Sequence, residues 1–246
     1  MTTLRGWPQE ADLLKRRFEE VFWSERLSTF VLALDREKKR CEVRTSNAGH
    51  SLYSGIASQE HGKRIAQTLM GQGSFTGWGI RTVDASEARY NPMSYHNGSV
   101  WPHDNSLIAS GLSSYGLKDA VINLVTGFFE ASNFVDLQRL PELFCGFHRR
   151  AGEGPTLYPV ACTPQAWAAA APFMFLQALL GLSITCVPKK RVSFFQPVLP
   201  PFLSSVAIQS LRVGESSMDL LVVRQAEGVK VQVLHGAGDV EVLTTA

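Results

Sequence analysis

The sequence between residues 90 and 105 reads YNPMSYHNGSVWPHDN and overlaps the end of a long irregular stretch that runs from Thr76 to Pro102. Tyrosine and tryptophan side chains are mixed here with histidine, asparagine and aspartate. A loop that only connects two helices is usually shorter and plainer than this. Aromatic and polar side chains carried on loops are typical of binding and catalytic sites. We therefore expect the functional residues of this chain to gather around this stretch.

Helical patterns flank the stretch on both sides. The first of them places Leu13, Phe18 and Phe22 on one face and charged side chains on the other. Two short strands joined by a charged turn are predicted at residues 29–34 and 41–45. The same reasoning predicts a set of helices, at residues 8–23, 59–70, 103–115, 119–131 and 164–182, with a short helix or turn at 136–139.

One apolar segment allows two interpretations. Residues 160–187 carry no formal charge and are followed by the basic run at 189–191, as a membrane span and its stop-transfer signal would be. Pro164, Pro172 and Gln177 interrupt the segment, and the chain contains no second candidate span. We favour a helix buried in a large helical domain, so we expect no association with a membrane.

The pattern changes after Pro188. Prolines mark a linker, and alternating apolar and polar residues then predict strands at 205–213, 218–224, 230–234 and 240–243. We predict two domains, a mainly α-helical one at residues 1–187 and a small antiparallel β unit at residues 188–246 that packs on it.

Charge and composition exclude several classes of protein. The chain has 24 Lys and Arg against 22 Asp and Glu, a formal net charge of +2, which gives no attraction for nucleic acid. Hydrophobic residues make up 45% of the chain, as expected for a folded domain rather than a disordered one.

Cysteines and known short motifs give no sign of a metal or cofactor. The four cysteines are far apart and form no zinc-binding pattern. His96 and His103 are seven residues apart without a third ligand at useful spacing, so we predict no metal site. No phosphate-binding loop is present, and we expect no cofactor. Because the N-terminus has no secretory signal, we expect a cytoplasmic protein.

A carbohydrate fits the remaining polar groups, because they are framed by aromatic rings. A pyranose has apolar faces that rest on aromatic rings and hydroxyl groups that pair with forked polar side chains. The alternative is a helical core in which Trp101 and Trp167 only pack, and composition alone slightly favours that alternative. The candidate residues are Trp78, Arg81, Tyr95, His96, Asn97, Trp101, His103, Asp104, Glu142, Gln165 and Trp167.

Glu142 is the sharpest single candidate. It lies between Pro141 and the apolar run at 143–145 rather than on a charged face. Burial tunes the protonation of a carboxylate, and glycoside hydrolysis needs one carboxylate to activate water and another to protonate the leaving oxygen. A glutamate that caps or ends a helix is the alternative. The residues alone favour neither.

Several blocks of this sequence together resemble a known family. Residues 77–82, 90–105 and 159–167 resemble bacterial glycogen debranching enzyme-like proteins of the amylo-α-1,6-glucosidase type, and so do residues 44–50 and 199–203. The resemblance implies a six-hairpin (α/α)6 glycosidase barrel that hydrolyses α-glucans, such as glycogen or oligosaccharides, with inversion. It also implies that Glu142 is the general base and that the other candidate residues bind the sugar.

Members of that family look several hundred residues longer than this chain. The resemblance therefore implies that the chain is the C-terminal half of the barrel plus its β unit, and that the general acid lies in a missing N-terminal half, on the same or a separate chain. The alternative is a truncated carbohydrate-binding half without turnover of its own. An open half-barrel would expose apolar surface, which indicates a partner.

Overall fold

The computed structural model describes residues 7–245 of the chain. Residues 1–6 and 246, which the two predicted domains include, lie outside the described residues. All the predicted helices are confirmed, and one further helix, α2, is present. The helices are α1 (Trp7–Phe22), α2 (Asn47–Tyr53), α3 (Gln59–Leu69), α4 (Pro102–Ser114), α5 (Lys118–Ser132) and α6 (Ala166–Leu180), with a 3-10 helix at Asp136–Gln138.

The helix missed by sequence reasoning is α2, which is short and rich in small residues and therefore shows no amphipathic period. Small residues are what its position requires, because α2 packs closely on α4. A Cβ atom added to Gly49 would lie 2.6 Å from Ile108 Cγ1, and one added to Gly111 would lie 2.5 Å from the Tyr53 amide nitrogen. Two glycines thus set the short distance between these helices.

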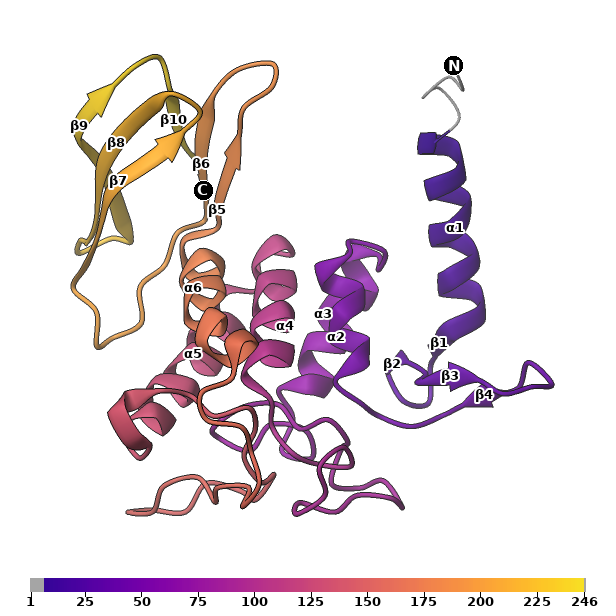
Figure 1. Ribbon diagram of the computed structural model, residues 1–246. Coiled ribbons are helices and arrows are strands. Elements are labelled where there is room, and N and C mark those ends of the chain that lie inside the picture. The colour runs from indigo at the N-terminus through magenta and orange to yellow at the C-terminus, as the bar shows by residue number, and fades with distance from the viewer. Residues whose placement is uncertain (1–6, 246) are drawn as a thin grey trace.

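The helices form two layers. An inner row holds α2, α4 and α6, with α4 in the middle, while α3 packs on α2 and α5 packs on α4 and α6 (Figure 1). One apolar core joins the layers, and Leu52, Ile108, Leu124 and Phe175 belong to it. The position of α4 explains why its buried residues run along its whole length.

At the outer edge of the inner row, α6 differs from the expected fully buried helix. Phe173 is 73% exposed and Trp167 is 46% exposed. Neighbours cover one side of α6, and its outer side remains open (Figure 1). Among residues 7–245, no helix has both the length and the apolar character that a membrane crossing requires.

Small strands follow α1. The first predicted strand is divided, because β2 (Thr29–Phe30) pairs with β1 (Trp23–Ser24) and β3 (Ala33–Leu34) pairs with β4 (Arg40–Cys41). The short pairs therefore replace the single predicted hairpin.

Two three-stranded sheets form the C-terminal unit. One has the order β7-β8-β9 and the other β10-β6-β5. Their facing sides enclose a second apolar core, which contains Phe194, Leu220 and Val222. The strands are β5 (Leu182–Thr185), β6 (Arg191–Phe195), β7 (Ser205–Val213), β8 (Ser216–Arg224), β9 (Val229–Ala237) and β10 (Glu241–Thr245).

Two details of this unit differ from the expected pattern. Strand β5 precedes Pro188 yet pairs with β6, so strand pairing crosses the predicted domain boundary. Strand β10 pairs with β6 in parallel, whereas an antiparallel unit was predicted. This parallel pairing is possible because strands β7, β8 and β9 lie between β6 and β10 in the sequence and form the long connection that a parallel pair needs.

The long irregular stretch forms a layer of loops at the end of the helices opposite the C-terminal sheets (Figure 1). Backbone pairing gives this layer a fixed shape. Val100 and Phe144 exchange hydrogen bonds of 2.9 and 3.0 Å, which joins the segment before α4 to the segment that carries Glu142. The loop layer is thus an ordered platform rather than a set of separate connections.

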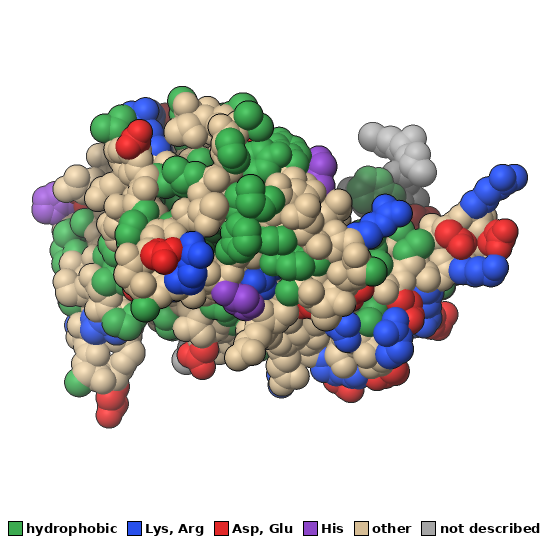
Figure 2. Space-filling model, turned by 90° about the horizontal axis from the view of Figure 1, so that it is seen from below, with side chains coloured by type: hydrophobic (Ala, Val, Ile, Leu, Met, Phe, Trp, Pro, Cys, Tyr) green, Lys and Arg blue, Asp and Glu red, His purple; other side chains and the backbone are tan. Residues whose placement is uncertain are grey.

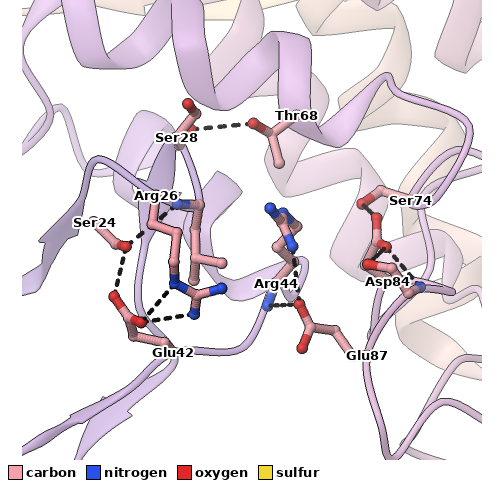
Figure 3. Close-up of polar contacts among 11 residues, drawn as sticks. Ser24, Arg26, Ser28, Glu42, Arg44, Thr68, Ser74, Asp84 and Glu87 are labelled. Carbon is pink, nitrogen blue, oxygen red and sulfur yellow. Dashed lines mark hydrogen bonds and ion pairs between the residues drawn. The ribbon is translucent and has the colours of Figure 1, made fainter.

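Polar contacts attach the small N-terminal strands to the loop layer and to α3 (Figure 3). The Arg44 guanidinium donates to Glu87 Oε1 over 3.3 Å, and the Thr68 hydroxyl donates to the Ser28 carbonyl over 3.1 Å. Within the loop layer, Ser74 donates to the Asp84 carboxylate over 2.6 Å. These contacts position the start of the inner row.

A buried lysine joins the far ends of the inner helices. Lys118 donates to the Ser113 hydroxyl over 2.8 Å and to the Ala178 carbonyl over 3.0 Å, at the end of α6. No carboxylate faces it among the described contacts. Burial lowers the pKa of Lys118 to about 8, because desolvation disfavours the charged ammonium.

We expect Lys118→Met to remove an alkaline rise in stability. Since the pKa of Lys118 is lower in the folded than in the unfolded chain, the folded state releases this proton first and gains stability as the pH rises from about 8 towards 10. The gain amounts to about 2–3 kcal/mol. Urea unfolding at pH 7 and pH 10 measures it, and Lys63→Met, which alters an exposed lysine on α3, is the matched control. An equal pH dependence in wild type and Lys118→Met would contradict this account.

Candidate active site

The inner helices α2, α4 and α6 all begin at the loop layer (Figure 1). Their first turns therefore project side chains towards the same end of the molecule. Trp101 precedes α4 in an extended conformation, and Gln165 precedes α6 in the same way. The Gln165 side chain also accepts a hydrogen bond from the Ala166 amide and caps α6. The loop end of the inner row is where the candidate residues meet.

Glu142 lies at the centre of this meeting point and is 5% exposed. The Tyr95 hydroxyl donates to Glu142 Oε1 over 2.6 Å, and the Cys162 amide donates to Oε2 over 3.1 Å. Gln165 Nε2 lies 3.5 Å from Oε1. The segments that carry Glu142 and Cys162 are held together by a second bond, from the Glu142 amide to the Cys162 carbonyl.

These donors decide the charge of Glu142. The Tyr95 hydroxyl, the Cys162 amide and the Gln165 amide together lower the pKa of Glu142, although burial acts in the opposite direction. Hydrogen bonding therefore outweighs burial here, because the donors stabilise the anion. In turn, the Glu142 carboxylate raises the pKa of Tyr95 to about 12. Glu142 is ionised at neutral pH and is suited to accept a proton rather than to donate one.

Removing the strongest of these donors gives a pH test. In Tyr95→Phe the pKa of Glu142 is expected to rise towards its ordinary value. An ionised base loses activity as the pH falls through its pKa, so the acidic limb of the kcat profile should move to higher pH. Rates measured from pH 3 to 8 test this shift. An acidic limb that stays in place, or moves to lower pH, would show that Tyr95 does not control the base.

Aromatic rings surround this carboxylate. Tyr95 packs edge-on against Trp101 at 4.8 Å and against Tyr158 at 5.6 Å, measured between ring centroids. His103 stacks on Trp167 at 4.1 Å, and Trp167 meets Trp101 at 6.1 Å. Hydrophobic side chains gather over the middle of the loop face in Figure 2.

The two tryptophans differ in what they offer a ligand. Trp101 is only 6% exposed, and its Nε1 donates to the Ser99 hydroxyl over 2.8 Å, so this ring mainly packs. Trp167 is 46% exposed and can receive the face of a sugar ring. His96 lies parallel to Trp101, with a centroid distance of 6.0 Å.

Two predicted binding residues lie below the surface. Trp78 is 2% exposed and Arg81 is 1% exposed. The Arg81 guanidinium donates to the Gly146 carbonyl over 2.6 Å and to the Gly73 carbonyl over 2.7 Å. We correct the prediction for both residues, because burial leaves them no surface for a sugar. Arg81 holds loops together, and Trp78 is part of the core.

Asn97 and Asp104 complete the predicted set. Asn97 is exposed, and its backbone amide donates to the Ser94 hydroxyl, which fixes a turn at the edge of the loop layer. Asp104 is 9% exposed and pairs with His50, a residue of α2 that sequence reasoning did not place in the site. Cys162 and Tyr158 were missed as well, because Cys162 contributes its backbone amide, which no sequence pattern reveals.

Comparison with protein families identifies the class of this fold. Residues 2–140, more than half of the chain, match the family model described as the mannosylglycerate hydrolase MGH1-like glycoside hydrolase domain. The chain belongs to this MGH1-like family. The predicted resemblance thus holds at the level of six-hairpin glycosidases, but the matching family is not that of the glycogen debranching enzymes.

Solved structures agree with this MGH1-like chain in fold. The GH63 mannosylglycerate hydrolase of Thermus thermophilus, in complex with Tris, matches 63% of this chain and 35% of its own, with 21% identity and a TM-score of 0.50. Neutral trehalase Nth1 of Saccharomyces cerevisiae matches 70% of this chain and 30% of its own, with 17% identity and a TM-score of 0.52. A GH78 family rhamnosidase of Bacillus sp. GL1 matches 95% of this chain and 22% of its own, with 16% identity and a TM-score of 0.58.

At these identities the likeness concerns the fold alone, and it supports the predicted six-hairpin type. The MGH1-like chain spans about a third of the length of the mannosylglycerate hydrolase. A search of curated proteins found no significant match.

Proposed function

We propose that this chain supplies the water-activating side of an inverting glycoside hydrolase, with Glu142 as the general base. The observation that carries the proposal is the Glu142 carboxylate, whose pKa is lowered by the Tyr95 hydroxyl and the Cys162 amide. Tyr95 in turn contacts Trp101, which contacts the half-exposed ring of Trp167. A fixed anion next to an aromatic platform is what the activation of water beside a sugar ring requires.

The two oxygens of Glu142 are bonded unequally. An ionised carboxylate has about four acceptor positions. The Tyr95 hydroxyl and Gln165 face Oε1, the Cys162 amide faces Oε2, and the Cys162 side chain also lowers the pKa of Glu142. In the proposed mechanism, Oε2 receives the attacking water. The water oxygen attacks the anomeric carbon, its proton passes to Glu142, and the glycosidic oxygen leaves with a proton from a general acid on the opposite side of the sugar.

We propose that the general acid and the rest of the barrel come from a helical half that precedes this one, on the same or a separate chain. The chain covers about a third of the matched mannosylglycerate hydrolase, which supports this proposal. Exposed apolar side chains also support it. Trp7 and Leu14 of α1 are 64% and 61% exposed, and Phe173 of α6 is 73% exposed, so both edges of the helical row carry apolar surface. Burial of such surface is the usual basis of association.

The proposed substrate is a small glycoside with a terminal α-linked sugar. An α-glucan or oligosaccharide is the substrate that the sequence resemblance implies, and mannosylglycerate is the substrate suggested by the description of the matching family. Maltose, panose and mannosylglycerate are therefore the first compounds to compare.

The stereochemistry of the first product tests the proposal. An enzyme in which water is activated by Glu142 releases the β anomer from an α-glycoside. Proton NMR during the first minutes of the reaction distinguishes the anomers before they interconvert. Release of the β anomer is the expected result. Release of the α anomer would mean a covalent intermediate with Glu142 or another nucleophile, and would overturn the proposal.

A further inference from the structure

A second pair of ionisable groups lies beside the candidate base. His50 comes from α2 and Asp104 from the first turn of α4, and His50 Nε2 lies 2.5 Å from Asp104 Oδ1. The side chain of His50 is 41% exposed, whereas that of Asp104 is only 13% exposed. The pair therefore joins two inner helices at the loop end, and its carboxylate is more deeply buried than its imidazole.

The pair belongs to the same site as Glu142. His103, which follows Pro102 at the start of α4, stacks on the exposed Trp167. Burial lowers the pKa of His103, and the charges of Asp104, His50 and Glu142 act on it as well. His103 therefore joins Asp104, its neighbour in α4, to the aromatic cluster around Glu142 through Trp167 and Trp101.

Asp104 keeps an unused acceptor. Its Oδ2 atom is buried and has no hydrogen-bond partner among the described residues, and the residue as a whole is 9% exposed. A buried carboxylate oxygen without a donor is energetically unfavourable. A hydroxyl of a bound sugar would supply a donor to this atom.

His50 is suited to hold that carboxylate in place. The hydrogen bond to Asp104 is the main cause of the raised pKa of His50, and burial acts against it only in part. The groups that face His50 from α4 are Asp104 and His103. On the other side, the cavity of about 300 Å³ between α1, β2 and α2 has uncharged phenylalanine side chains on its wall. Asp104 is thus the anion that sets the charge of His50.

We propose that His50 is a positioning residue that fixes Asp104, so that Asp104 Oδ2 accepts a hydrogen bond from a hydroxyl of the bound sugar. Asp104 is then a binding residue, and His50 acts through it. This inference rests on the proposed function, since it assigns the partner of Asp104 as a sugar, but it is measured by binding rather than by turnover.

Binding by His50 variants tests the positioning role. The full chain, together with its upstream half, is titrated with methyl α-D-glucoside and methyl α-D-mannoside. We expect His50→Ala to weaken binding about tenfold, the loss of one charged hydrogen bond. His50→Gln keeps a donor and should stay within about threefold of wild type. His61→Ala is the matched control, because His61 forms a similar pair with Glu19 over 3.2 Å, outside the site.

Sugars that lack one hydroxyl test the role of Asp104. We expect one deoxy sugar to bind wild type more weakly than the parent sugar does. The same deoxy sugar should bind wild type and Asp104→Asn almost equally, which is the signature of a direct contact. In parallel, the imidazole signals of the chain labelled with ¹⁵N at histidine give the pKa of His50, which should fall in Asp104→Asn.

Three results would overturn the inference. They are wild-type affinity in His50→Ala, equal weakening in His50→Ala and His61→Ala, and the absence of any deoxy sugar that couples to Asp104. None of them depends on Glu142. If Glu142→Gln is fully active while His50→Ala binds weakly, the proposed function fails and the sugar contact remains.

Discussion

Glu142→Gln is expected to lower kcat of the complete enzyme about 1,000-fold and to leave substrate affinity almost unchanged. Glutamine has nearly the same size. Its carbonyl oxygen can still accept from the Cys162 amide, and its NH2 group can donate to the Tyr95 hydroxyl oxygen, so both contacts that hold Glu142 in place are kept. It cannot take a proton from water. General base catalysis contributes about 10²–10⁴-fold to rate, so the loss should fall in kcat rather than in binding.

A carboxylate outside the site gives the control for this variant. Glu87 bonds to Arg44 in the loop layer and is part of the polar contacts of Figure 3. Glu87→Gln should change stability slightly and should leave kcat within about twofold of wild type. A rate for Glu142→Gln close to that of Glu87→Gln would remove Glu142 from the mechanism.

The second large effect is the difference in activity between the isolated chain and the complete enzyme. The 246-residue chain on its own is expected to hydrolyse substrate at least about 100-fold more slowly than the chain combined with the proposed upstream half. Loss of a general acid accounts for a factor of this size. Activity of both preparations on panose, maltose and mannosylglycerate, at equal concentration, measures the difference. Full activity of the isolated chain would place the general acid within it and would contradict the proposed division.

Association with the upstream half supplies an independent check. Trp7 and Leu14 on α1 and Phe173 on α6 are large, apolar and exposed. Replacing Phe173 by Asp should weaken the association of the two halves without unfolding the chain, because the side chain makes few contacts in the described structure. Ultracentrifugation of the mixture, with Phe173→Leu as control, separates loss of association from loss of folding.

Five of the six helices in the described residues could be predicted. Helices α1 and α3 carry a clear apolar stripe, and α6 is a continuous apolar run. The exception, α2, is built from small residues that pack closely on α4, and a helix with Gly49 facing Ile108 shows no periodic signal. Strand β5 was missed for a related reason. Its residues continue the apolar run of α6, and only the left-handed conformation of Gly181 ends the helix there.

The candidate site could be predicted in part. The cluster around Glu142 brings together Tyr95, Trp101 and Trp167 as expected. The sequence does not reveal which side chains lie below the surface, so it assigned Arg81 to the ligand although the residue is buried and its Nε and Nη1 donate to backbone carbonyls. It also does not reveal a pair such as His50 and Asp104, whose contact spans 54 residues.

Azide rescue of Glu142→Ala in the complete enzyme tests the central claim most directly. An α-glycosyl fluoride is a suitable substrate, because its leaving group needs little help from an acid. The account predicts that azide occupies the space of the lost carboxylate, raises the rate at least about tenfold and yields the β-glycosyl azide. A variant that stays inactive with azide while it still binds the sugar, or that yields the α-glycosyl azide, would contradict the role of Glu142 as the base.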